Sequence, residues 1–165
     1  SYYLFYKNLF MKKKKIIEKL IKKKITISTA ESCTGGLLAS EIISVPNSSK
    51  IFNLGLVTYS NISKQKILKV KKKNLVKFGA VSSQVCGEML ENLYKISRSK
   101  VCISTTGIAG PGGGSALKPV GLVYIGFKFE KKSKIFMFNF SKKLPRNKIQ
   151  KLTVTKILNL IDKLI

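Results

Sequence analysis

The sequence predicts one α/β domain with a mixed β-sheet, and two features of the chain predict it. β-Branched or apolar runs alternate with segments whose apolar residues recur at helical spacing, and two strand-like runs follow each other directly near the end. The length of 165 residues and the hydrophobic content of 44% suit a single core, and no linker divides the chain.

The elements of the first half follow from local patterns. Helical spacing of apolar residues predicts an amphipathic helix around residues 16–21, and the β-branched run 25–29 predicts a strand. A second helix is expected from Leu37 until the turn at Pro46, followed by a strand over residues 52–59.

The second half begins with short helical segments. Ser60 or Asn61 is expected to cap the first of them, and Ser82 is expected to begin a longer helix. The remaining predicted elements are strands over 101–106, 120–129 and 135–140, the last two joined as a hairpin around 131–134, and a final helix that Pro145 opens.

The segment Ala-Glu-Ser-Cys-Thr-Gly-Gly, residues 30–36, joins the first predicted strand to the second helix. Such a turn directs backbone N–H groups and the positive end of a helix dipole at one spot. Ser32 therefore either caps the helix or acts as a nucleophile beside an oxyanion site. On this segment alone, the cap is the commoner role.

The formal net charge of +25 would ordinarily indicate nucleic acid or an anionic membrane as partner. Thirty of the 32 basic residues are lysines, as in AT-rich genomes, and they occur in every segment from Lys12 to Lys163. We therefore expect a solvated, self-repelling surface, with no specific nucleic-acid partner and no membrane partner.

Residue types that are rare or missing narrow the chemistry. The sequence contains no histidine, which excludes a Ser-His-Asp triad, a Cys-His pair and histidine-ligated metals, and its seven acidic residues form no paired cluster. We expect neither a metal nor a cofactor. Three cysteines without C-x-x-C spacing, Cys33, Cys86 and Cys102, favour a reducing, cytoplasmic location.

The first ten residues are aromatic and precede the basic run Lys12 to Lys15, the reverse of a signal peptide, and they are too short to span a bilayer. Met11 is a candidate start. Residues 1–10 are then a flexible extension and residues 11–165 the domain, or the ten residues are an ordinary flexible terminus.

A glycine-rich loop over residues 107–115 invites a nucleotide interpretation. It matches neither the P-loop nor the dinucleotide fingerprint, and it leads into a strand, whereas both of those phosphate loops require a helix N-terminus. It is either a ligand loop with exposed backbone N–H groups or a wide turn.

Several motifs occur in order from about Ile16 to the end of the chain. They are Ala30 to Gly36, Val57-Thr58-Tyr59-Ser60-Asn61 with Lys64, Gly79-Ala80-Val81-Ser82, and Thr106 to Pro111 with Lys118-Pro119-Val120-Gly121. Together they resemble the nicotinamide-nucleotide amidohydrolases, the family of the CinA C-terminal domain.

The resemblance implies a three-layer α/β/α fold and a histidine-free serine amidase. Its bacterial standalone members deamidate nicotinamide mononucleotide in the salvage of pyridine nucleotides, and they commonly form homodimers.

Ser32 matches the nucleophile of this family, with Lys64 and Tyr59 as assisting residues. A lysine serves as the base if desolvation or a neighbouring cation lowers its pKa, and Tyr59 would orient or relay the proton. The implied substrate-binding residues are Glu31, Thr34, Gly35, Thr106, Gly107, Ile108, Ala109, Gly110 and, for the 5′-phosphate, Arg146.

Alternatives stay open for single residues and for the whole chain. Glu31 either orients Lys64, contacts substrate or favours the helix N-terminus by its charge. Cys33 is a second possible nucleophile or a small buried residue. Arg146 is a phosphate ligand or an exposed arginine at a helix start. A non-catalytic module that keeps the fold and binds nucleotides or nucleic acid is the alternative function.

Overall fold

The computed structural model describes residues 2–165; Ser1, the first residue of the expected extension, lies outside the described residues. A five-stranded mixed sheet crosses the described chain, with strands ordered β2-β1-β3-β4-β5. The strands are β1 (Ile27–Glu31), β2 (Phe52–Val57), β3 (Val101–Gly107), β4 (Leu122–Phe129) and β5 (Lys132–Asn139).

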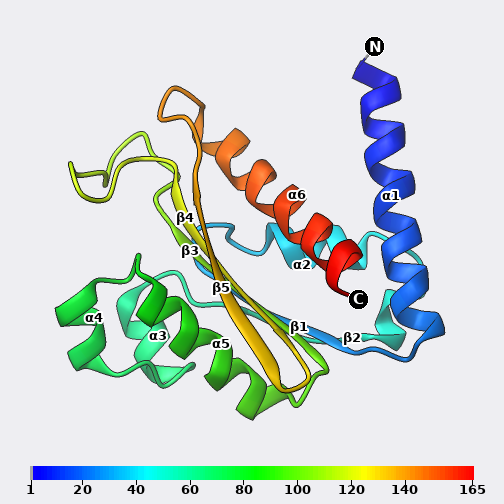
Figure 1. The fold of residues 1–165 in the computed structure, drawn as a ribbon, viewed down its shortest axis with the longest axis horizontal. Coiled ribbons are helices and arrows are strands. Elements are labelled where there is room, and N and C mark those ends of the chain that lie inside the picture. The colour runs from blue at the N-terminus through cyan, green and yellow to red at the C-terminus, as the bar shows by residue number, and fades with distance from the viewer. Residues whose placement is uncertain (1) are drawn as a thin grey trace.

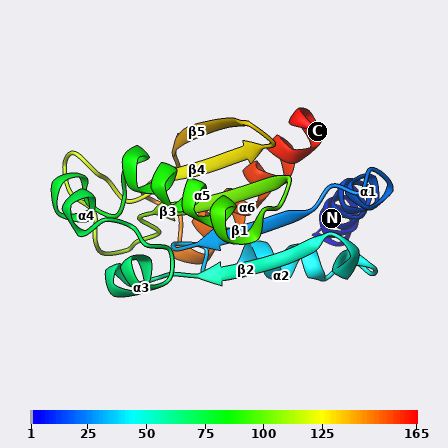
Figure 2. The ribbon, with the colours of Figure 1, turned by 90° about the horizontal axis from the view of Figure 1, so that it is seen from below.

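Helices cover both faces of this sheet, so the predicted α/β/α layering is confirmed (Figures 1 and 2). One face carries α1 (Tyr2–Lys22), α2 (Leu37–Ile43) and α6 (Arg146–Leu164), and a short 3-10 helix, η1 (Ser48–Lys50), follows α2. The other carries α3 (Asn61–Lys66), α4 (Lys72–Phe78) and α5 (Ser83–Ser97).

Side-chain alternation along the central strands divides the core in two. Ile103 of β3 packs with the α1, α2 and α6 layer, whereas its neighbour Cys102 packs with α5. In β1, Ile27 and Ala30 likewise belong to opposite cores. Both faces of the central strands β1 and β3 are buried, and the buried residues include polar ones such as Ser28, Thr29 and Ser104.

Strand directions place three carboxyl ends at one edge. β1 pairs in parallel with β2 and β3, with Glu31 opposite Val57 and Thr105. β4 and β5 then add an antiparallel hairpin. Its turn comprises Glu130 and Lys131, so β5 begins earlier than the predicted residue 135. The left-handed φ of 54° at Glu130 allows this tighter turn.

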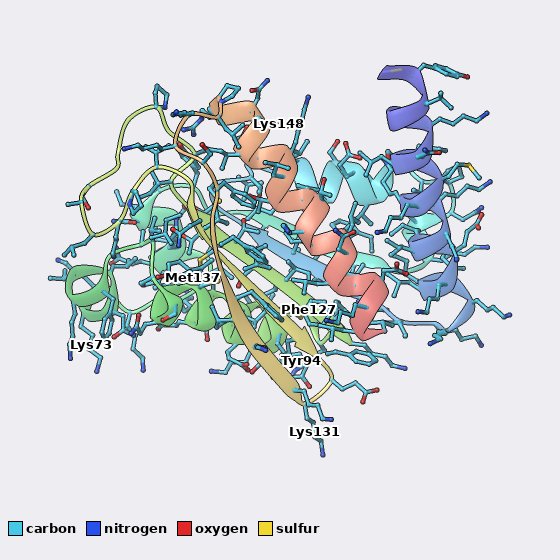
Figure 3. The ribbon with its side chains drawn as sticks, turned by 45° about the horizontal axis from the view of Figure 1, so that its top comes forward. Lys73, Tyr94, Phe127, Lys131, Met137 and Lys148 are labelled. Atoms are coloured by element: carbon cyan, nitrogen blue, oxygen red, sulfur yellow. The ribbon has the colours of Figure 1, made fainter. Side chains whose placement is uncertain are left out.

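Helix α1 runs from Tyr2 to Lys22 and passes Met11 without a break. The division into an extension over residues 1–10 and a domain over residues 11–165 stays a prediction. Within residues 2–165, no helix combines the length and apolar content that crossing a membrane requires. Lysine side chains project from many elements, among them Lys73 of α4 and Lys148 of α6 (Figure 3).

Gly121 connects the glycine loop to the hairpin. Its N–H donates to Ile108 O, its carbonyl accepts from Phe140 N, and its φ is +95°. A Cβ at this position would collide with the Phe140 carbonyl.

We expect Gly121→Ala to lower the free energy of unfolding by about 2 kcal/mol or more, because it adds backbone strain to a steric clash. Urea unfolding measures the loss. Gly112→Ala is the matched control, since nothing lies within 4 Å of its added Cβ. Equal stability of the two variants would contradict this account.

Candidate active site

The candidate site lies beyond the carboxyl ends of β1, β2 and β3. Ser32 directly follows β1, and its N–H donates to the carbonyl and Oγ1 of Thr105 on β3, at 3.1 and 3.3 Å. The chain leaves β1 toward β2 on one side while β3 lies on the other. Open α/β sheets bind ligands at such a point, where the connections diverge.

Lys64 contacts Ser32 directly. Its Nζ lies 2.9 Å from Ser32 Oγ and also donates to the carbonyls of Thr58 (2.7 Å) and Tyr59 (3.1 Å). In the neutral amine the two hydrogens can serve the two carbonyls. The lone pair then faces the Ser32 hydroxyl, which is the arrangement a general base requires.

Burial adjusts the proton affinity of this amine. The Lys64 side chain is almost completely buried, with 1% exposure, and burial lowers its pKa from 10.5 to about 8. About a tenth of the lysine is then neutral at pH 7. The sequence left open whether desolvation or a neighbouring cation would lower the pKa, and the cause is desolvation.

The short helix α3 positions Lys64. Ser60 caps this helix as predicted, because its Oγ accepts from Ser63 N at 3.0 Å. The Lys64 N–H donates to Ser60 O, so the lysine lies one turn after the cap and faces inward. The cap thereby fixes the end of the helix from which the base projects.

Of the two roles considered for Ser32, the structure contradicts the helix cap. Helix α2 begins only at Leu37, because Gly35 and Gly36 have φ values of +58° and +97° and interrupt helical geometry. The capping role belongs to Glu31, whose carboxylate accepts from the N–H groups of Leu38 and Ala39 at 2.9 and 3.1 Å. Ser32 is thus held in a tight turn, and Gly35 N donates to its carbonyl.

Of the three roles considered for Glu31, the geometry shows the helix N-terminus. Both carboxylate oxygens are engaged there, and the residue is 1% exposed.

Cys33 is also buried, and burial raises the pKa of its thiol to about 12. A protonated, enclosed thiol is a poor nucleophile, so Ser32 is the better candidate.

The Tyr59 phenol points to a different partner from the one expected. Its oxygen accepts from Arg146 at 2.8 Å, and Arg146 also donates to the Gly110 carbonyl at 2.8 Å. Among the described residues, the phenol makes no hydrogen bond to Lys64 or Ser32. Tyr59 contacts the base through its carbonyl instead.

The other expected substrate residues divide between the site and its surroundings. Thr34 Oγ1 contacts Thr105 Oγ1 at 2.9 Å, and Gly35 is exposed beside Ser32 with open space where a side chain would lie. Thr106 Oγ1 donates to Ala80 O on the connection before α5. Gly107 belongs to β3, Ile108 pairs with Leu122 and Gly121, Ala109 is buried, and Gly110 accepts from Arg146.

The sequence-family model of the CinA C-terminal domain matches residues 10–165 of this chain. The chain belongs to the CinA C-terminal domain family. A CinA-like protein of Endomicrobium trichonymphae is 51% identical over 142 residues, which are 86% of this chain and 33% of that protein. The chain thus spans about a third of the length of the curated relatives it matches.

Solved CinA-family structures share the fold. The competence/damage inducible protein CihA from Agrobacterium tumefaciens has a TM-score of 0.86 at 35% identity, covering 93% of this chain and 95% of that one. A competence-damaged protein (CinA) superfamily protein from Escherichia coli has a TM-score of 0.87 at 29% identity, covering 93% and 88%. The fold around Ser32 and Lys64 is therefore the CinA-family fold.

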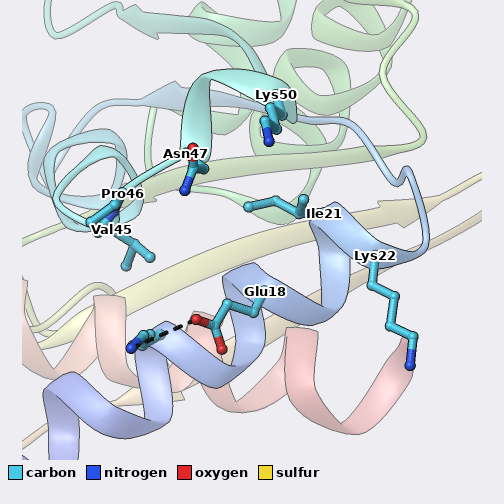
Figure 4. A pocket seen from close by; sticks show the side chains of 8 residues that line it. Glu18, Ile21, Lys22, Val45, Pro46, Asn47 and Lys50 are labelled. Carbon is cyan, nitrogen blue, oxygen red and sulfur yellow. Dashed lines mark ion pairs between the residues drawn. The ribbon is translucent and has the colours of Figure 1, made fainter.

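Two surface hollows of this CinA domain lie away from Ser32 and Lys64. One of about 410 Å³ lies between α1 and the segment after α2, lined by Glu18, Lys22, Asn47 and Lys50 among others (Figure 4). Another lies along α1. Within the described chain, no three His, Cys, Asp or Glu side chains gather closely enough to hold a metal ion. Neither hollow is lined by a serine, threonine or cysteine, whereas Ser32 and Lys64 supply a nucleophile and a base in direct contact.

Sequence reasoning missed two residues that hold the nucleophile turn. Thr105 contacts both Ser32 and Thr34, and Gln150 of α6 donates to the Cys33 carbonyl at 3.0 Å. Thr105 lies inside a predicted buried strand, where polar side chains need hydrogen-bond partners, and that is a usable signal. Gln150 follows Cys33 by 117 residues and carries no local signal.

The lowered pKa of Lys64 predicts a pH-dependent stability. Between pH 8 and 10.5 the unfolded chain holds the Lys64 proton more tightly than the folded chain, so folding is favoured as the pH rises. The free energy of unfolding should gain about 3 kcal/mol from this residue across the interval, and Lys64→Met should lack this gain. Urea unfolding at pH 7.5 and pH 10 measures the difference between variant and wild type.

Lys66→Met, an exposed replacement on the same helix, controls for the loss of one lysine. A difference between Lys64→Met and wild type that is the same at both pH values would overturn the assignment of a desolvated lysine.

Proposed function

We propose that this CinA-family domain is a serine amidohydrolase that converts nicotinamide mononucleotide into nicotinate mononucleotide and ammonia. The supporting observation is the 2.9 Å contact between the buried Lys64 Nζ and Ser32 Oγ. The choice of substrate rests on the resemblance of the motifs, residues 30–36 above all, to the nicotinamide-nucleotide amidohydrolases. From the same resemblance we propose a cytoplasmic homodimer that acts in the salvage of pyridine nucleotides.

The acylation step uses the two side chains in sequence. Neutral Lys64 takes the Ser32 proton while Ser32 Oγ bonds to the carboxamide carbon, and the carbonyl electron pair moves onto oxygen. Lys64 then gives its proton to the amide nitrogen, the C–N bond breaks, and ammonia leaves an acyl-enzyme. Water attacks the ester with Lys64 again as base, and Ser32 regains its proton as nicotinate mononucleotide departs.

Backbone donors for the oxyanion are available in the nucleophile turn. The Cys33 and Thr34 N–H groups donate to no other residue in the described part of the chain. Both residues are almost completely buried, where an unpaired N–H is costly. Each donor aimed at the developing oxyanion typically contributes about 3–4 kcal/mol to the transition state.

Arg146 is the proposed ligand of the substrate's 5′-phosphate. It is exposed at the first position of the 19-residue helix α6, and both of its present partners, the Gly110 carbonyl and the Tyr59 phenol, are neutral. A phosphate dianion would bind a guanidinium at a helix N-terminus more strongly than a phenol does. On this proposal, substrate binding replaces the Tyr59 contact.

Ammonia release from nicotinamide mononucleotide tests the function. Wild type should release ammonia, and Ser32→Ala should lose at least about a thousandfold in kcat, because the nucleophile is gone. Cys33→Ala is the matched control from the next position and should retain most of the activity, since its thiol is protonated and buried.

Negligible release by both wild type and Ser32→Ala would overturn the amidohydrolase proposal. Salt-sensitive binding to duplex DNA by such an inactive protein would instead support the non-catalytic module, for which the net charge of +25 is the relevant observation. Loss of activity in Cys33→Ala with retention in Ser32→Ala would reassign the nucleophile.

The Lys64 pKa of about 8 sets the expected pH profile. Only the neutral amine accepts the Ser32 proton, so kcat/KM should rise about tenfold per pH unit below pH 8 and level off above it. Initial rates of ammonia release between pH 6 and 9.5, at constant ionic strength, measure the profile. Activity that is flat or falls across this range would contradict a lysine base.

A further inference from the structure

Helix α6 reaches the nucleophile turn through one hydrogen bond that the proposed mechanism does not use. Gln150 Nε2 donates to the Cys33 carbonyl at 3.0 Å. Gln150 lies one turn after Arg146, on the same side of the helix, and its neighbour Ile149 is in the core. The amide donor is therefore mounted on a rigid, packed element.

The Cys33 carbonyl and the Thr34 N–H belong to the same peptide group. A trans peptide is planar, and its C=O and N–H point in opposite directions. A hydrogen bond that fixes the carbonyl thus also fixes the direction of the N–H. It additionally polarises the peptide, which makes the N–H a stronger donor.

Of the Cys33 and Thr34 N–H groups, that of Thr34 is the better available donor. The Cys33 N–H lies against its own sulfur, whereas the Thr34 N–H has no partner in the described chain. Thr34 is 2% exposed, and Thr105 holds its hydroxyl. The Gln150 bond to the Cys33 carbonyl and the Thr105 bond to the Thr34 hydroxyl thus anchor the turn on either side of the Thr34 N–H.

We propose that Gln150 is a positioning residue for the oxyanion hole: it holds the Cys33–Thr34 peptide so that the Thr34 N–H binds the oxyanion formed when Ser32 attacks. This inference rests on the proposed serine chemistry. The bond between Gln150 and Cys33 is made in the resting protein, so the donor needs no reorientation during the reaction.

The test compares Gln150→Met and Gln150→Glu, which keep the side-chain length and remove the amide donor, with the exposed neighbour variant Lys151→Met. A fluorophosphonate probe reports the chemistry of Ser32 independently of the natural substrate, because its P=O oxygen takes the place of the oxyanion. Mass spectrometry gives the site, the final stoichiometry and the second-order rate constant of labelling. Steady-state ammonia release gives kcat and KM.

Both Gln150 variants should label Ser32 roughly ten- to a hundredfold more slowly than wild type but to the same final stoichiometry, and kcat should fall with KM unchanged. Lys151→Met should behave as wild type. A purely structural role would lower the stoichiometry, or the melting temperature, without changing the rate constant of the folded fraction.

Two results would overturn the inference, and they can be told apart. If wild type is labelled at Ser32 and the Gln150 variants react at the same rate, the positioning role is wrong and the amidohydrolase proposal stands. If wild type is neither labelled at Ser32 nor releases ammonia, the serine chemistry itself is wrong, and the role of Gln150 falls with it.

Discussion

The contact between a buried, desolvated lysine amine and a serine hydroxyl is the interaction on which the rest of this site depends. Water or a nearby carboxylate would restore the ordinary pKa of Lys64 and remove the base. The fold surrounds Nζ with two neutral carbonyls, and the adjacent acid, Glu31, is turned onto the N-terminus of α2. A carboxylate beside Lys64 would raise the lysine pKa, whereas in this position Glu31 stabilises helix α2, which follows the nucleophile turn.

Each part of the site comes from a different element, and the sheet brings them together. β1 delivers Ser32, the end of β2 leads to Lys64, and β3 supplies Thr105. Helix α6, the last element of the chain, contributes Arg146, which donates to Gly110 O, and Gln150, which donates to Cys33 O. The central parallel strands are buried on both faces, so residues packed in the core determine the position of this edge.

Periodicity predicted the elements well because each element's pattern is local. Ser60, one of the two expected caps, does cap α3, and Ser82 begins α5 as predicted and caps it, since a capping serine acts within three residues of itself. Ser32 failed as a cap because the left-handed glycines at 35 and 36 delay the helix, and a sequence does not display φ. Lys64, one lysine among thirty, was assigned as the partner of Ser32 only through the family resemblance. The role of Gln150 could not be predicted, because it depends on a contact between segments far apart in the sequence.

The two hydrogen bonds from the N-terminus of α2 to Glu31 also limit how the length of this segment can vary. The carboxylate at the end of β1 and the N–H groups of Leu38 and Ala39 close a ring around residues 32–37, so a single insertion or deletion there would break the closure and displace the serine. The glycine loop has the opposite character. It is tied at Gly110 by Arg146 and at Lys118, which donates to Phe78 O, while its tip between them is exposed. Length changes during evolution should therefore collect in the loop tip and avoid the nucleophile turn.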